Sequence, residues 1–160
     1  MAKVGIVMGS KSDFDVARPA VEILKKFGVE TEVRVISAHR TPDEAHAYAK
    51  SARERKIDAI IAVAGKAAHL GGVLAAYTTL PVIGLPVQTS MMGGLDSLLS
   101  IVQMPAGVPV ATVGVNAGLN AGLLALQILA VRDESIQKGL EDYKSALAEQ
   151  VINDDKTLSL

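Results

Sequence analysis

The sequence contains no cysteine and no tryptophan, and only 3% of its residues are aromatic. The absence of cysteine excludes disulfide bonds, thiolate nucleophiles and cysteine-ligated metals. Because no run of about 18 uninterrupted apolar residues is present, we expect no transmembrane helix. Residues 1–3 lead directly into a strand-like segment, without a charged and apolar signal region, which predicts a cytoplasmic protein.

Neither sign of charge is in excess, since 16 Lys and Arg residues face 17 Asp and Glu residues. This balance gives no electrostatic reason to expect binding to nucleic acid or to an anionic membrane. Hydrophobic residues make up 49% of the chain, and Val, Ile, Leu and Ala must form the core. The length predicts a single α/β domain over residues 1–160, with a core at about 3–131 and a C-terminal helix and tail at about 133–160.

Short apolar segments alternate with helical patterns along the chain. The alternation predicts right-handed βαβ units and a flavodoxin-like three-layer sandwich. We expect a five-stranded parallel sheet in the order 2-1-3-4-5, with an extra C-terminal helix. The expected strands are 4–8, 30–36, 58–63, 81–87 and 108–113. The expected helices are 16–27, one that opens at 41–44, 67–77, 94–104, 116–131 and 134–152.

Local signals predict where two of these helices begin and end. Gly28 is placed as the left-handed residue that ends the first helix. Thr41, Pro42 and Glu44 predict the start of the second helix, with Pro at the first helical position and Thr and Glu forming a capping box.

The fifth helix is apolar around almost its whole circumference over residues 120–131. A helix that covers one face of a sheet normally keeps a polar stripe, so this helix is expected to be buried on two sides. We predict that a second subunit covers it, in an obligate homo-oligomer with a large apolar interface. The alternative is that the C-terminal helix folds back over it.

Ligands of such sheets bind beyond the carboxyl ends of the strands, so the loops after the strands are the candidate site. The first loop contains Gly9, Ser10, Ser12 and Asp13. A glycine, two hydroxyls and a helix N-terminus suit a phosphate, and a carboxylate suits ribose hydroxyls. The loop matches neither phosphate-binding fingerprint, and a helix cap plus a turn is the alternative interpretation.

The second loop contains Ser37, Ala38, His39 and Arg40 just before a helix. The arginine offers a bidentate fork to phosphate, and the histidine can pass protons either way near neutral pH. The alternative is a surface loop with two ordinary polar residues.

The third loop contains Ala64, Gly65, Lys66, His69 and Leu70. Its small residues permit close packing against a flat ligand. Lys66 either neutralises an anion or faces solvent, and His69 is either part of the site or a structural histidine. No set of His, Asp and Glu residues has the spacing of a metal site, so we expect no metal.

These loops together resemble the N5-carboxyaminoimidazole ribonucleotide mutase family of purine nucleotide biosynthesis. The likeness extends over about residues 3–130 and includes the segments 8–13, 37–42, 67–70, 96–105 and 120–125. The resemblance implies an isomerase that moves a carboxyl group from the exocyclic nitrogen to C4 of the imidazole without a cofactor. It also implies a homo-octamer.

The resemblance implies a role for each loop. His39 would be the general acid and base. The remaining candidates would bind the ribonucleotide: Ser10, Ser12, Asp13 and Arg40 at the ribose phosphate, Ala64, Gly65, His69 and Leu70 around the carboxylate, and Gly9, Ser37, Ala38 and Lys66 beside them. The sequence departs from the family at Lys66, where Gly is usual, and at Gly71, where Pro is usual.

Two other functions remain open. One is direct carboxylation of 5-aminoimidazole ribonucleotide with carbon dioxide, on the same fold and pocket. The other is a non-catalytic flavodoxin-like module that binds a nucleotide or a flavin. A response receiver is disfavoured, because no acidic cluster follows the first strand and Asp58 precedes the third.

Overall fold

A computed structural model describes residues 1–158, and a five-stranded parallel sheet forms its centre. The strands are β1 (Lys3–Met8), β2 (Glu30–Val35), β3 (Ala59–Ala64), β4 (Val82–Pro86) and β5 (Ala111–Thr112). Their order is β2-β1-β3-β4-β5, which confirms the predicted topology. β5 is shorter than the predicted 108–113. Pro109 has no N–H group to donate to a neighbouring strand, and pairing starts only after it.

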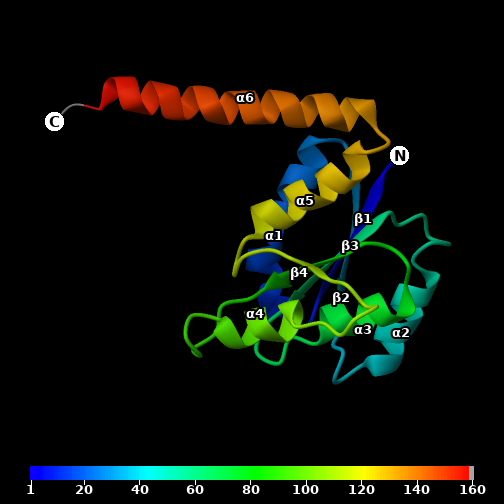
Figure 1. Cartoon of the computed structure of the whole chain (residues 1–160). Helices are drawn as coiled ribbons and strands as arrows, with labels where there is room; N and C mark the ends of the chain where they lie inside the picture. Colours follow the sequence, from blue (N-terminus) through cyan, green and yellow to red (C-terminus); the bar gives the residue numbers. More distant parts are fainter. Residues whose placement is uncertain (159–160) are drawn as a thin grey trace.

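Helices cover both faces of the sheet (Figure 1). One buried cluster joins the sheet to α1 and α5, and a second joins it to α2, α3 and α4. Because both faces are covered, all six residues of β3 are buried. The helices are α1 (Phe14–Lys26), α2 (Pro42–Ser51), α3 (Leu70–Tyr77), α4 (Leu95–Val102), α5 (Gly118–Ala130) and α6 (Glu134–Thr157), and a short 3-10 turn, η1 (Lys11–Asp13), precedes α1.

The sequence predicted the end of the first helix and the start of the second, and these two predictions had different outcomes. Gly28 follows the end of α1 with a φ of 72°, as predicted. Pro42 does begin α2, but the predicted capping box of Thr41 and Glu44 is wrong. The Thr41 hydroxyl instead bonds backward to both backbone groups of Ser37, at 3.0 Å each. The threonine therefore stabilises the loop before the helix rather than the helix end.

Glycines let α1 and α5 approach each other closely. At Gly122, a Cβ atom would overlap the Ile23 side chain and the backbone of Ala20. One helical turn earlier, a Cβ on Gly118 would overlap the carbonyl of Val16. Small residues at this spacing place one face of α5 directly against the backbone of α1.

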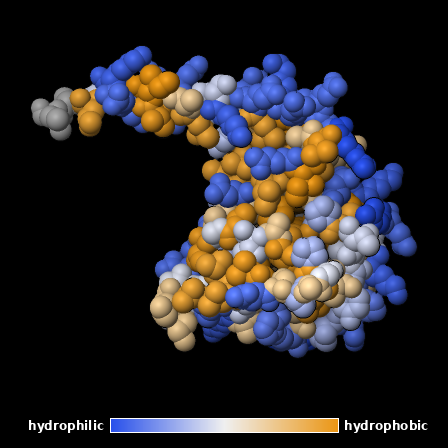
Figure 2. All heavy atoms as spheres, viewed as in Figure 1, coloured by the Kyte–Doolittle hydropathy of each residue, from blue (hydrophilic) through white to orange (hydrophobic). Residues whose placement is uncertain are grey.

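Helix α6 leaves the body of the molecule (Figure 1). Its first turns bury Ile136 and Leu140 against α5 and α1, so α6 covers part of the apolar fifth helix. Its outer half exposes Leu147 (46%), Val151 (67%) and Ile152 (52%). We call this outer half of α6 the arm. Figure 2 shows hydrophobic surface on the arm and over the body below it. Within residues 1–158, no helix combines the length and apolar composition needed to cross a membrane.

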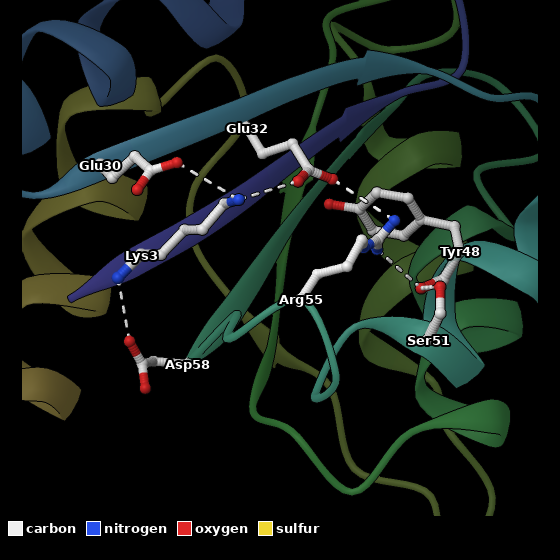
Figure 3. A network of polar contacts seen from close by, with 7 residues as sticks. All are labelled: Lys3, Glu30, Glu32, Tyr48, Ser51, Arg55 and Asp58. Carbon is white, nitrogen blue, oxygen red and sulfur yellow. Dashed lines mark hydrogen bonds and ion pairs between the residues drawn. The ribbon is translucent and has the colours of Figure 1, made fainter. Parts of the chain in front are cut away.

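A polar network lies where β1 and β2 run side by side (Figure 3). Lys3 Nζ lies 3.2 Å from Glu30 and 3.1 Å from Glu32, and these two carboxylates raise the pKa of the lysine. Arg55 lies 3.6 Å from Glu32, donates to the Tyr48 carbonyl at 3.0 Å and stacks over the Tyr48 ring. The network connects the edge strand β2 to β1 and α2.

Candidate active site

A hollow of about 590 Å³ lies at the carboxyl ends of β1, β2, β3 and β4. Every candidate residue from the three loops lies on its wall. They are Gly9, Ser10, Ser12, Asp13, Ser37, Ala38, His39, Arg40, Ala64, Gly65, Lys66, His69 and Leu70. The parallel sheet produces this arrangement, because its strands all end at the same edge.

The loop after β1 is a small network of hydroxyls closed by a carboxylate. The Ser10 N–H donates to Asp13 Oδ2 at 3.1 Å, and the Ser10 and Ser12 hydroxyls lie 2.9 Å apart. Gly9 N–H donates to the Val63 carbonyl at 3.0 Å, which fixes this loop to β3. Two hydroxyls and a turn at the start of α1 therefore face the hollow as hydrogen-bonding partners for an anion.

Asp13 is the one carboxylate among the residues that line the hollow. Burial raises the pKa of its carboxyl group, and the hydrogen bonds from Ser10 and Ser12 oppose the rise only in part. A partly desolvated carboxylate costs stability unless it has partners. Its position at the site suits a ligand that brings hydroxyl donors.

The loop after β2 is held by hydrogen bonds to Ser37. Ser37 Oγ accepts from the backbone N–H of Arg40 at 3.2 Å and from its Nε at 3.3 Å. Arg40 Nη2 reaches across to the carbonyl of Gly9 at 2.9 Å. These contacts use two of the five N–H donors of the guanidinium group, so others remain for an anion in the hollow.

Two imidazoles meet across the hollow. His39 Nε2 lies 2.8 Å from His69 Nδ1, and the rings form an edge-to-face pair with centroids 4.9 Å apart. His69 occupies the N-cap position of α3, so the position of its ring depends on that helix start. This pair gives the hollow a group that can both give and take protons. His46 lies outside the hollow, where its ring packs on that of Tyr77.

The loop after β3 has an unusual backbone conformation at Lys66, whose φ is 58°. The Lys66 carbonyl accepts a hydrogen bond from the Ser100 hydroxyl of α4 at 3.4 Å. Gly65 packs against Val87, the residue after β4, because a Cβ atom on Gly65 would lie 3.3 Å from Val87 Cβ. The loop is therefore a close-packed backbone surface with one long cationic side chain.

The site residues predicted from the sequence include none from the loop after β4, although that loop forms part of the wall. Gln88 and Thr89 line the hollow, as do Ala67 and Val87. Thr89 Oγ1 donates to Asp96 at 2.6 Å, and the Gln88 N–H donates to the Asn116 side chain at 2.8 Å. The rule that ligands bind beyond strand ends covers this fourth loop too, but its sequence gave no reason to single out Gln88 or Thr89.

The hollow carries more positive than negative groups. Arg40 and Lys66 are its cations, Asp13 is its carboxylate, and the two histidines can add charge. Within residues 1–158, no three His, Asp or Glu side chains gather as a metal site would require. The arrangement suits an anionic, hydroxyl-bearing small molecule that undergoes proton transfer.

The flavodoxin-like sheet and this hollow define an α/β enzyme with its site at the strand ends. Residues 3–150 match the AIR carboxylase family, and the chain belongs to this family.

Named relatives agree with this assignment. The chain is 54% identical over 152 residues to the N5-carboxyaminoimidazole ribonucleotide mutase of Thermotoga maritima, covering 95% of this chain and 89% of that one. It is 57% identical over 138 residues to the enzyme of the same name from Aquifex aeolicus, covering 86% and 83%. The crystal structure of Treponema denticola PurE superposes over the full length of both chains, with a TM-score of 0.89 and 30% identity.

Proposed function

We propose that this protein is an N5-carboxyaminoimidazole ribonucleotide mutase, an isomerase of purine biosynthesis. The observation that carries this proposal is the high identity over almost the whole chain to relatives of that name. The meeting of His39 and His69 in a cationic hollow supports it, because the carboxyl shift needs proton transfer on an anionic substrate. The substrate and product are soluble metabolites, and we place the reaction in the cytoplasm.

In this proposal the ribose phosphate binds at the loops after β1 and β2. Ser10, Ser12 and Arg40 supply hydroxyl and guanidinium donors to the phosphate. Asp13 accepts from ribose hydroxyls, which would compensate for its desolvation. The contact of Arg40 with the Gly9 carbonyl holds the two loops together before the ligand arrives.

The first chemical step breaks the bond between the exocyclic nitrogen and the carboxyl carbon. His39 donates a proton to that nitrogen, and the carboxyl group leaves as carbon dioxide. The bonding electrons stay on the nitrogen, which makes the aminoimidazole ring rich in electrons at C4. The backbone and small side chains at Ala64, Gly65 and Leu70 keep the carbon dioxide beside the ring.

The second step forms the new carbon–carbon bond. C4 attacks the carbon dioxide, and the resulting carboxylate is attached to a carbon that still carries its hydrogen. The neutral His39 takes this proton, which restores the aromatic ring and returns the imidazole to its starting state. One proton is given and one is taken, so the steps require no external cofactor.

A second candidate function is direct carboxylation of 5-aminoimidazole ribonucleotide. The name of the matched family, AIR carboxylase, supports this second candidate. The same hollow would serve, with carbon dioxide supplied from solution instead of from the substrate. A requirement for bicarbonate together with the uncarboxylated substrate distinguishes this reaction from the mutase.

We also propose that the protein is a homo-oligomer, with the octamer that the family resemblance implies. Leu147, Val151 and Ile152 are exposed on an arm that has no other described element of its own chain beside it. An isolated helix is marginally stable in water, so a packing partner is expected for this arm. The apolar surface over α4 and α5 offers a second copy a matching face (Figure 2).

The decisive experiment measures the conversion of N5-carboxyaminoimidazole ribonucleotide to its C4-carboxylated isomer by purified protein. His39→Asn is assayed beside the wild type, and each is tested with and without bicarbonate. Turnover by the wild type alone, without a bicarbonate requirement, supports the mutase and the role of His39. Turnover only of the uncarboxylated substrate with bicarbonate supports the carboxylase, and no turnover of either substrate refutes both.

A further inference from the structure

Lys66 has a backbone conformation that its side chain makes unfavourable. Its φ of 58° lies in the left-handed region, which glycine enters freely and other residues enter at a cost. The residue nevertheless lies on the wall of the hollow. An unfavourable conformation at a site residue suggests that its side chain has a function there.

Lys66 also lacks a protein partner for its charge. Within residues 1–158, its ammonium group forms no ion pair, and the one carboxylate on the wall, Asp13, is bonded to Ser10. A lysine of this kind beside an otherwise cationic hollow is suited to an anion that arrives with the ligand.

The two cations of the hollow stand on different loops. Arg40 follows β2 and Lys66 follows β3, and β1 lies between those two strands. Two strand spacings, about 10 Å, separate β2 from β3, and Arg40 Nη2 reaches back to the Gly9 carbonyl beyond β1. The pair of His39 and His69 joins the same two loops. A ligand with two anionic groups could therefore place one at each cation and its reacting ring at the imidazoles.

We propose that Lys66 binds the migrating carboxylate and determines the preference for a carboxylated over an uncarboxylated ribonucleotide. This inference rests on the proposed function, which supplies a phosphate for Arg40 and a carboxylate for Lys66. The ammonium group has three donors on a flexible stem. It can stay with the carboxylate on the exocyclic nitrogen and, after the shift, on C4.

The test compares the binding of two ligands, 4-carboxy-5-aminoimidazole ribonucleotide and 5-aminoimidazole ribonucleotide, by calorimetry. Lys66→Asn removes the charge but keeps a residue that tolerates a left-handed backbone. We expect this substitution to weaken binding of the carboxylated ligand about 10- to 100-fold, which is the contribution of a hydrogen bond to a charged group. The affinity for the uncarboxylated ligand should stay unchanged. Lys66→Arg should keep most of the preference.

The chain contains a matched control for the backbone effect. Lys56 is also left-handed, with a φ of 60°, but it lies outside this hollow. Lys56→Asn should leave both affinities unchanged. Equal weakening of both ligands by Lys66→Asn, or no change in either, overturns the inference. The wild-type turnover assay tests the mutase separately, because selective binding can persist in a protein that fails to turn over.

Discussion

His39 Nε2 and His69 Nδ1 lie within hydrogen-bond distance, at 2.8 Å, although 30 positions separate the two residues in the chain. At this distance one nitrogen carries a proton and the other accepts it. The two rings therefore act as one unit, in which the state of each imidazole restricts the state of the other. The loops after β2 and β3 must both be in place for the unit to form.

His39→Asn should lower kcat about 10²- to 10⁴-fold, the usual contribution of a general acid and base. His69→Asn should lower kcat less, because it removes only the partner that orients His39. The double variant should be little worse than His39→Asn, since residues that act as a unit are not additive. Initial rates of all three variants test this, and fully multiplicative losses would show that the two histidines act independently.

Asp13→Asn should stabilise the protein at neutral pH and weaken substrate binding. Burial raises the pKa of Asp13 above the ordinary value of 3.8, so the folded state holds this proton more tightly than the unfolded state. The wild type therefore loses stability as pH rises from about 3.8 through the raised value. Thermal unfolding at pH 3 to 8 should show that the variant is more stable than the wild type. This gain in stability should grow as pH rises across the window. A gain that is independent of pH would contradict the desolvation argument.

Arg55→Met should lower the free energy of unfolding by about 1–3 kcal/mol, because it leaves the partly buried Glu32 with Lys3 as its remaining ion-pair partner. Arg18 is a matched control. It too stacks on an aromatic ring and pairs with a carboxylate, but its side chain is 52% exposed against 30% for Arg55. Arg18→Met should change stability by less than about 0.5 kcal/mol in denaturant titrations. Equal losses would show that burial is not the deciding factor.

Gly122→Ala should destabilise the protein by about 1–3 kcal/mol, although alanine is the better helix former, because the new methyl group overlaps α1. The exposed Asn120 on the same helix provides the control. Asn120→Ala should change stability by less than about 0.5 kcal/mol. Denaturant midpoints measure both, and a stabilising Gly122→Ala would mean that the two helices can separate without loss.

Replacing both Leu147 and Val151 by Glu should reduce the mass of the particle in solution. The two side chains are exposed on the arm, and charges there would oppose burial against another copy. Light scattering coupled to gel filtration measures the mass. Gln150→Glu, which adds a charge at a neighbouring exposed position, should leave it unchanged. An unaltered mass in the double variant would exclude this arm from the interface.

The sequence carried enough information to predict the sheet. The buried runs at β1, β3 and β4 alternate with helical patterns, which predicts the interior of a parallel sheet. The order 2-1-3-4-5 is one of two common orders for such sheets, and the flavodoxin type was the one expected. The sequence did not predict the contacts made at the ends of the helices. Thr41 has two possible partners, the helix N-terminus and Ser37, and only the folded loop decides between them.

The sequence predicted which loops line the candidate site, but it did not predict which of their side chains are in contact. Each loop could be assigned to the strand before it, so the shared edge of the sheet placed Ser10, Arg40 and His69 around one hollow. The contact between His39 and His69 depends on where α3 begins, which was expected at 67 and is at Leu70. Lysine itself gives no signal for the left-handed conformation of Lys66, but the glycine that is usual at this position in the family does.

Every residue on the wall of the hollow comes from the stretch between Gly9 and Thr89, whereas α5 and the exposed arm belong to the last third of the chain. The segment between them supports the wall from behind, through hydrogen bonds of Asp96, Ser100 and Asn116. The residues of the hollow and the surface proposed for contact with a second copy thus lie in successive parts of the chain. If the proposed oligomer forms through α5 and the exposed arm, changes in those helices would alter the contacts between copies without replacing a residue on the wall of the hollow.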